Sequence, residues 1–291
     1  VQTACVNTGI TQAGVLSAVA RYSIVVLVVM MALGRLTPGI EIVQQAVINQ
    51  CEQSKDRFAI LDIPPGEKPR GAMQWRRLFN TSYAAFYYPY VVPSSSTTGK
   101  AIPPCGHVAG IYARCDQTQG VYRAPANEVI EGIVDLELFL QQQDIVTLNE
   151  EGVNCSQVFA QRGIRTWGAR TASGEPMLRH VNVRRTLIAI TRALNVGLQW
   201  VLFRTNDDKL WGTLARDVTY FLDQLWREGY LRGDAQDEAF IVKCDDETNP
   251  ARSIEQGQVN IGIWLAPLRP AEFIGVRITQ EIDVLAREDG A

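Results

Sequence analysis

The stretch that decides the fold is residues 163–185, GIRTWGARTASGEPMLRHVNVRR. Its first part places Ile164, Thr166 and Trp167 in an extended, β-prone setting. The turn-forming residues 172–174, ASG, follow it, and a helical pattern begins at Asn182. The stretch therefore predicts the end of one α/β unit and the start of another, which divides the chain into domains at residues 1–172 and 173–291.

Five arginines lie in this junction, whose only acid is Glu175. Guanidinium groups commonly pair with carboxylates in a bidentate manner, so we expect the partners to come from elsewhere in the chain or from a neighbouring copy. The alternative is that the arginines extend their stems along a domain edge into water. The five are Arg165, Arg170, Arg179, Arg184 and Arg185.

Composition narrows the class of protein. The 291 residues are 46% hydrophobic and 20% charged, which is typical of a globular chain with a large core. A net charge of −3 argues against a dedicated nucleic-acid binder. The longest apolar run, residues 24–33, is too short to span a bilayer and fits a buried strand. Six cysteines without a CxxC pair and only two histidines predict reduced thiols and neither a metal nor a cofactor.

The first domain shows the pattern of a parallel sheet covered by helices. Residues 24–33 predict a strand, the turn at residues 37–39 leads into a helix, and residues 57–63, RFAILDI, predict a second strand. This order is a βαβ unit. We also expect a helical segment from Trp75, a strand over residues 84–92, a helix ending at Gly120, a strand over residues 129–140 and a turn over residues 148–154.

The second domain alternates helices with strands. A helix is expected from Asn182 to near Gly197, then a buried strand over residues 198–203. Residues 206–208, NDD, supply an N-cap for a long amphipathic helix that closes at Gly229. Residues 238–243 and 258–265 predict two further strands, giving an α+β domain.

Near the end of the chain, apolar residues alternate with polar ones over about eleven positions, which as a strand would extend roughly 36 Å. Such a strand leaves a long unpaired edge that an assembly can use for strand addition. The alternative is an ordinary hairpin strand within its own sheet. The alternating residues are Ile274, Val276, Ile278, Ile282 and Val284.

Chemistry-bearing motifs are sparse. No serine lies in a GxSxG elbow, and no glycine-rich phosphate loop is present. His107 lies close to Cys105 and Cys115 and could form a Cys–His pair; the alternative is a helix N-terminal histidine bonded by backbone. The acidic residues 245–247, DDE, lack the spacing of a calcium loop and fit a solvated turn better.

Five motifs in order resemble the contractile tail sheath family, which includes phage tail sheaths, R-type tailocins and phage-like contractile injection systems. The resemblance spans residues 40–280. The motifs are PPCGHVAGIYAR at residues 103–114, GVYRAPANE at 120–128, WGART at 167–171, VNVRR at 181–185 and APLRPAEFI at 266–274.

The resemblance implies a three-layer, subtilisin-like α/β sheath domain, followed by an α+β C-terminal domain with strand exchange between subunits. It implies a structural subunit without catalytic residues or cofactors, in stacked hexameric rings that contract around an inner tube. The implied partners are identical subunits, the inner tube protein, and baseplate and terminator or cap proteins, with neither nucleic acid nor direct membrane insertion. Assembly would take place in the bacterial cytoplasm, within a particle that can be released.

Residue roles follow from the same resemblance. The intersubunit strand would be residues 274–284, and the domain-junction residues would be Trp167, Arg170, Arg184 and Arg185. The helix after Asp207 would face the tube through Arg216 and Arg227. Residues 1–23 depart from the family's extended N-terminal arm. Two competing hypotheses stay open: an α/β hydrolase-like enzyme using His107, and a polymerising shell protein unrelated to injection.

Overall fold

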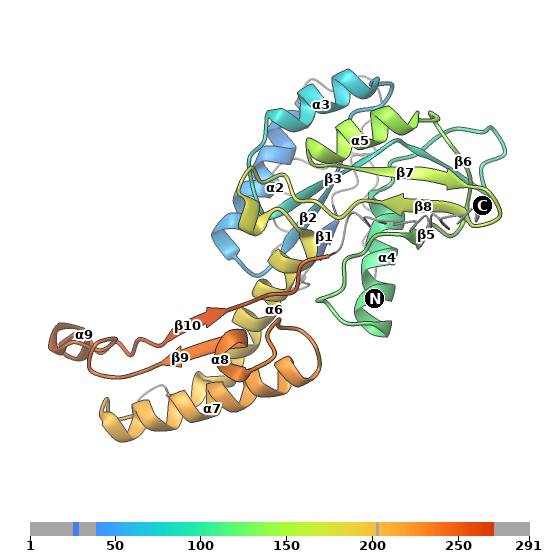
Figure 1. Ribbon diagram of the computed structural model, residues 1–291. Helices are drawn as coiled ribbons and strands as arrows, with labels where there is room; N and C mark the ends of the chain where they lie inside the picture. The colour runs from blue at the N-terminus through green and yellow to red at the C-terminus, as the bar shows by residue number, and fades with distance from the viewer. Residues whose placement is uncertain (1–25, 29–38, 202–203, 271–291) are drawn as a thin grey trace, which may run out of the picture.

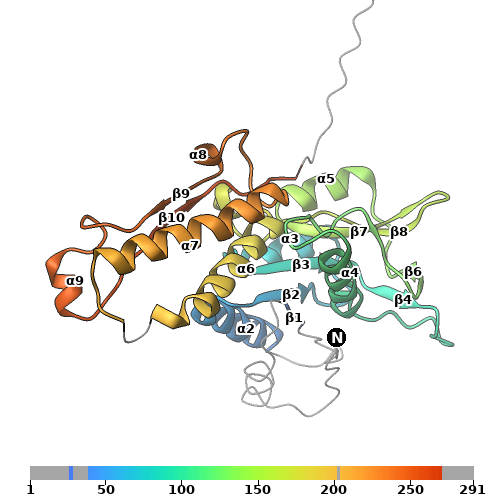
Figure 2. The same cartoon turned by 90° about the horizontal axis from the view of Figure 1, so that it is seen from below.

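The computed structural model describes residues 26–28, 39–201 and 204–270. The predicted terminal strand, with Ile274, Val276, Ile278, Ile282 and Val284, lies outside these residues. The described chain forms a larger body with a six-stranded sheet and a smaller, elongated body (Figure 1). Helix α6 (Val181–Gly197) runs from one body into the other, which both views show (Figure 2). The molecule is therefore a mixed α/β protein built around a connecting helix.

The large sheet has the strand order β1-β2-β3-β7-β8-β5. Its first four strands are parallel, and β8 and β5 join the far edge in antiparallel fashion. The strands are β1 (Val26–Val28), β2 (Phe58–Asp62), β3 (Ala84–Tyr88), β7 (Val153–Phe159), β8 (Gly163–Trp167) and β5 (Glu128–Val129). Because β1 and β2 are parallel and flank helix α2 (Ile40–Ser54), the predicted βαβ unit is confirmed.

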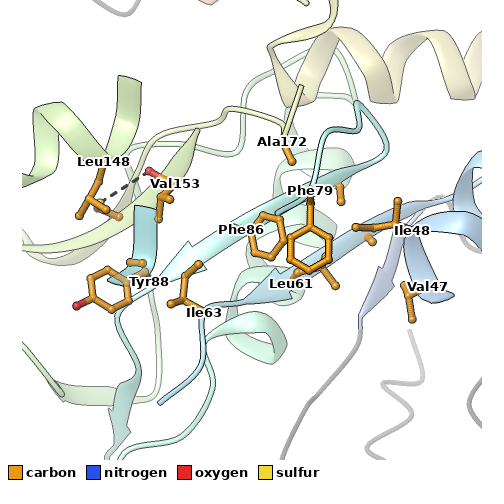
Figure 3. Packing of buried hydrophobic residues seen from close by; sticks show 14 of the residues in the cluster. Val47, Ile48, Leu61, Ile63, Phe79, Phe86, Tyr88, Leu148, Val153 and Ala172 are labelled. Atoms are coloured by element: carbon orange, nitrogen blue, oxygen red, sulfur yellow. Dashed lines mark hydrogen bonds between the residues drawn. The ribbon is translucent and has the colours of Figure 1, made fainter. Parts of the chain in front are cut away.

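Alternation along the central strands sends side chains to both faces of the sheet. Ala59 and Leu61 of β2 pack under helices α2, α3 (Pro69–Arg77) and α5 (Gln142–Glu150). Phe79 and Phe86 meet in this cluster, with ring centroids 5.2 Å apart (Figure 3). Each buried aromatic or branched side chain contributes about 1.5–3 kcal/mol to folding, so this cluster is a main source of stability.

The opposite face of the sheet is covered by α4 (Cys105–Thr118) and the first half of α6. Phe58 and Ile60 of β2 pack there against Val108 and Tyr112 of α4 and Val181 of α6. The connecting helix therefore begins as part of the core of the larger body.

The smaller body packs α7 (Asp208–Arg227) against a two-stranded antiparallel sheet of β9 (Phe240–Lys243) and β10 (Gly262–Leu265). Ile190 of α6, Val218 and Leu222 of α7 and Phe240 of β9 share its core. The predicted N-cap is confirmed, because Asp207 accepts a hydrogen bond from the backbone nitrogen of Leu210. The smaller body also contains the short helices α8 (Gln236–Ala239) and α9 (Ala251–Glu255).

Two predicted strands are each divided in the structure. Residues 84–92 form β3 and then β4 (Val91–Pro93), because Pro89 has no N–H to donate to a ladder. Residues 129–140 divide at Gly132, which has a positive φ, into β5 and β6 (Ile133–Leu136). β6 pairs with β4 in a small separate ladder.

Three other predictions were wrong in position or type. Helix α3 begins at Pro69, six residues before the predicted Trp75. The predicted buried strand at residues 198–203 is a 3₁₀ turn at Gln199–Val201, because Leu198 and Val201 pack as helical residues against α7. The turn predicted over residues 148–154 overlaps the start of β7, which is a central strand of the large sheet. This strand was not predicted because several of its residues are polar. An apolar or polar run alone does not distinguish these cases.

Candidate functional site

The segment between β8 and α6, residues 168–172, is held by one buried side chain of β7. The amide of Asn154 donates hydrogen bonds to the carbonyls of Phe86 (3.1 Å) and Arg170 (2.8 Å), and accepts one from the backbone nitrogen of Arg170 (2.7 Å). Gly168 has φ +135°, and a Cβ there would lie 2.9 Å from Asn154 Oδ1. The junction therefore needs both a side-chain amide at 154 and a glycine at 168.

Backbone hydrogen bonds then dock the junction at both of its ends. Ala172 donates to Ala84 of β3 (2.8 Å), and Thr171 donates to Arg179 (2.7 Å). Val181, the first residue of α6, donates to Ala169 (2.9 Å). The strand-to-helix transition is consequently tied to the large sheet along its length.

Helix α6 is locked to α4 by a buried ion pair. Arg185 is fully buried and donates to both carboxylate oxygens of Asp116 at 2.9 and 2.5 Å. Its guanidinium lies 4.6 Å from the ring centre of Tyr112, whose hydroxyl is 2.7 Å from that of Tyr87. Bidentate geometry with aromatic stacking offsets part of the cost of burying the charge.

Neighbouring side chains of α6 make two further attachments. Arg184 stacks 4.3 Å from the ring centre of Tyr83 and donates to Ser82 Oγ. Asn182 donates to the carbonyls of Tyr122 and Leu268, both at 2.9 Å. Asn182 thereby joins three segments that are far apart in sequence: α6, the loop after α4 and the chain beyond β10.

The predicted junction residues do not share one role. Trp167 ends β8 and packs against Phe159, with ring centroids 4.9 Å apart. Arg170 is buried, and its Nη1 donates to the Glu150 carbonyl at 3.4 Å. Arg184 and Arg185 attach to different partners, as described above. The sequence motif thus contains residues whose contacts are structural but separate.

The structure adds Asn154, Asn182 and Asp116 to this site, none of which the sequence argument singled out. Asn182 stands inside the VNVRR motif, so its position carried a signal. Asp116 stands 69 residues from Arg185, and Asn154 lies in a strand that was not predicted. These pairings depend on the packing of α4, β7 and α6.

A buried carboxyl lies at the carboxyl end of β2. Asp62 Oδ1 accepts a hydrogen bond from the backbone nitrogen of Cys105, the first residue of α4, at 3.0 Å. Burial raises the pKa of Asp62 to about 7, although the Cys105 hydrogen bonds act to lower it. Burial also raises the pKa of the Cys105 thiol well above its usual range. Both groups therefore favour their neutral forms in this environment.

His107 lies in the first turn of α4, where burial lowers the pKa of its imidazole. Cys115 is eight residues further along the same helix, about 12 Å by the rise of an α-helix, which is beyond hydrogen-bond reach. Burial raises the pKa of Cys115 to about 11, which disfavours the reactive thiolate. The helix geometry thus places Cys115 too far from His107 to form a Cys–His pair with it.

The described residues contain neither a metal-binding cluster nor a membrane-spanning helix. Residues 26–28, 39–201 and 204–270 contain no group of three or more His, Cys, Asp or Glu side chains placed to hold a metal ion. Within the same ranges, no helix is both long and apolar enough to cross a bilayer.

The predicted tube-facing arginines lie on the outer side of α7. Arg216 pairs with Asp217, and Arg227 pairs with Asp223 at 2.8 Å. Both arginine side chains are about three-quarters exposed. The opposite side of α7 packs on β9 and β10, and neither of these strands pairs with a third strand in the part of the chain that the structure describes.

Comparisons with known proteins agree across sequence and structure. Residues 10–172 match the phage tail sheath protein central domain, and residues 173–281 match the phage tail sheath C-terminal domain. A putative prophage major tail sheath protein of Pseudomonas aeruginosa (strain UCBPP-PA14) is 27% identical over 244 residues, which are 81% of this chain and 61% of that protein. The tail sheath protein of Salmonella phage ViI is 24% identical over 77% of this chain and 37% of its own length. The chain thus spans less than two thirds of these curated relatives.

Solved structures show the same similarity. The sheath complex of an extracellular contractile injection system, PVC, in the contracted state is 26% identical with a TM-score of 0.83, over 94% of this chain and 75% of that one. A chain in the baseplate of the anti-feeding prophage (AFP) in the contracted state is 28% identical with a TM-score of 0.80. The match covers 93% of this chain and 76% of that one.

Proposed function

This chain belongs to the phage tail sheath family, and from that premise we propose that it is a structural subunit of a contractile sheath. The proposed role is mechanical: copies polymerise as stacked hexameric rings around an inner tube, and their contraction drives the tube through a target envelope. The similarity to contracted PVC and AFP assemblies supports it. For the alternative, an α/β hydrolase-like enzyme using His107, the structure provides no Cys115–His107 pair, because these two residues lie about 12 Å apart along α4.

The single observation that carries this proposal is the incomplete sheet of the smaller body. Among the described residues β9 and β10 pair only with each other, so the outer edge of each strand presents backbone donors and acceptors to which another chain can add a strand. We infer that strands from neighbouring copies complete this sheet, with Val276 and Ile278 in the donated segment. Main-chain hydrogen bonds hold such strands firmly while demanding little of the side chains, so subunits can pivot without separating.

The domain arrangement follows the same proposal. Residues 1–172 form a subtilisin-like, three-layer sheath domain, and residues 173–291 form the C-terminal domain. Helices on both faces of the large sheet support the three layers. The term names a fold only and carries no claim of protease activity. The rigid attachment of α6 to both bodies would let one subunit move as a unit during contraction.

The proposed partners are identical subunits, an inner tube protein, and baseplate and terminator or cap proteins. A head-to-tail interface of donated strands generates an open helical tube instead of a closed oligomer. The exposed face of α7, with Arg216 and Arg227, is proposed to face the inner tube. Contraction would release energy stored by assembly in an extended state, so it needs neither nucleotide nor cofactor. Assembly would take place in the bacterial cytoplasm, before release of the particle.

Electron microscopy of the purified full-length protein tests the proposal. Tubes or rings are expected, and a protein that stays monomeric at high concentration contradicts a sheath role. Co-purification of an inner tube protein separates a contractile sheath from an unrelated polymerising shell.

Strand donation has its own test. The variants Val276→Pro and Ile278→Pro remove ladder donors, so each should block polymer formation while leaving the fold intact. Thr97→Pro, in an exposed loop, is the control and should polymerise normally. Intact polymers from both strand variants would reject strand donation.

A further inference from the structure

Two arginines line a single pocket on the larger body. Arg76 comes from the last turn of α3, and Arg179 follows the short 3₁₀ helix at Pro176–Leu178. The pocket has a volume of about 270 Å³. Its other lining residues are Glu150, Glu151, Gly152, Thr171, Ser173 and Gly174.

In the described part of the chain, the guanidinium groups of Arg76 and Arg179 have no ion pair within 4 Å. Arg76 Nε is buried without a hydrogen-bond acceptor. The side chain of Arg179 makes no hydrogen bond or ion pair within residues 39–201 and 204–270. The Glu151 carboxylate is occupied by Arg77, at 2.9 and 2.6 Å. Two cationic groups thus share a pocket without a bonded anion, which is costly unless a ligand supplies one.

The electrostatics of Arg76 agree with this geometry. Burial lowers the pKa of Arg76, Glu151 acts to raise it, and the charges of Arg179 and Arg77 lower it further. An anion between Arg76 and Arg179 would relieve their mutual repulsion.

The surrounding backbone holds the pocket open. Gly152 has φ +82°, and a Cβ there would lie 2.9 Å from the Thr171 carbonyl oxygen and 3.0 Å from Arg76 Nε. A glycine at this position therefore leaves space for the guanidinium. Thr171 is hydrogen-bonded to the segment that carries Arg179. Its backbone nitrogen donates to the Arg179 carbonyl, and its hydroxyl donates to the Leu178 carbonyl.

The charge of the lining selects the class of anion. Arg76, Arg179 and the adjacent Arg77 bring three positive charges, and Glu150 and Glu151 bring two negative ones. The remaining single positive charge matches a carboxylate better than a doubly charged phosphate. Arginine forks also match the planar geometry of a carboxylate.

We propose that this pocket binds an Asp or Glu carboxylate of a second copy of this chain. The inference rests on the proposed function, because a helical assembly holds neighbouring copies at a high effective concentration that favours even a weak ionic contact. The chain carries 31 acidic residues against 28 Lys and Arg, so side chains of this class are plentiful. The second copy would thereby supply the carboxylate that the junction arginine Arg179 lacks among the described residues.

The first test compares polymer formation by matched arginine variants. Arg76→Gln and Arg179→Gln each remove one positive charge from the pocket. The control is Arg70→Gln, which removes an exposed arginine of α3, the helix that carries Arg76, and Arg70 does not line the pocket. Sedimentation should show a loss of polymer of about tenfold for the double pocket variant, corresponding to about 1.4 kcal/mol per contact. Arg70→Gln should polymerise as wild type does, and circular dichroism should show that all variants fold.

The second test identifies the acid. Arg179→Lys keeps the charge and permits carbodiimide coupling to a bound carboxylate. Polymers are assembled from a mixture of ¹⁴N-labelled and ¹⁵N-labelled subunits. Mass spectrometry should then find the peptide that contains residue 179 cross-linked to an acidic peptide that carries the other nitrogen isotope. Coupling only within one copy, for example to Glu150, would overturn the proposal.

A third measurement separates a free anion from a second copy. The melting temperature of unassembled wild-type subunits is compared in acetate, phosphate and chloride at one ionic strength. If acetate or phosphate stabilises wild type and the double variant still polymerises normally, the pocket binds small anions and the second-copy proposal fails. Normal polymers from the double variant sink the inference while leaving the sheath role intact. Wild type that never polymerises contradicts the sheath role itself, and the inference with it.

Discussion

Arg185 and Asp116 form a bidentate ion pair in which the arginine is fully buried and the aspartate reaches the surface. The pair joins α6 to α4, 69 residues earlier in the chain. Because α6 continues into the smaller body, this contact anchors the connecting helix within the larger one.

Removing Asp116 should destabilise the protein strongly. Asp116→Ala leaves the Arg185 charge buried without a counter-ion, so we expect a loss of about 3 kcal/mol in the free energy of unfolding. Chemical denaturation of unassembled subunits measures it. The control is Asp217→Ala, which breaks the exposed pair with Arg216 and should change stability by less than about 0.5 kcal/mol. Equal losses in the free energy of unfolding of both variants would show that the buried Arg185–Asp116 pair contributes no more to stability than the exposed pair.

Asn154 should be the most sensitive asparagine of the junction. Asn154→Ala removes three hydrogen bonds and leaves backbone groups of Phe86 and Arg170 unsatisfied, so we expect a loss of about 2–4 kcal/mol. Asn195→Ala, on the exposed side of α6, should be neutral or slightly stabilising because alanine favours helices. Thermal unfolding compares the two. A neutral Asn154→Ala would contradict the assigned role.

Two glycine variants should change stability in opposite directions. Gly168→Ala forces a side chain at φ +135° against Asn154, with an expected loss of about 1–3 kcal/mol. Gly212→Ala lies in α7 with open space around it and should gain about 0.5–1 kcal/mol. Their melting temperatures should therefore move apart, and a tolerated alanine at 168 would disprove the close packing there.

Asp62 should make stability depend on pH. Burial raises the pKa of Asp62 to about 7 in the folded state, whereas an unfolded aspartate titrates near pH 4. Between these values the unfolded state releases the proton and the folded state keeps it, so stability falls as pH rises from about 4 to about 7. Asp62→Asn should remove this component, which is on the order of 2–4 kcal/mol.

The measurement is denaturation of unassembled subunits at several pH values. Asp246→Asn, in an exposed turn, is the control and should keep the pH dependence of wild type. If Asp62→Asn also keeps the wild-type dependence, Asp62 is ionised in the folded protein and the assignment is wrong.

Local patterns were sufficient where one segment settles its own structure. The βαβ order of β1, α2 and β2, and the capped helix α7, follow from apolar spacing, turn residues and Asp207, each acting within a few positions. The ordered motifs also indicated the family, because each is a short sequence pattern that can be identified without the tertiary structure.

Long-range packing settled the remainder. Strand β7 was missed because Asn154 and Ser156 are polar yet buried, and only neighbouring strands and helices make such burial favourable. The apolar residues 198–201 formed a 3₁₀ turn because α7 offers them a helical partner.

The amino-acid order was thus enough to predict a mixed α/β fold and the family, since these depend on short-range spacing and on motifs. Only the tertiary structure showed that Asp116 is the carboxylate that pairs with Arg185. It also showed that no carboxylate among the described residues pairs with Arg179. A side chain selects its partner by proximity in space, and residues far apart along the chain come together only when the helices and strands pack.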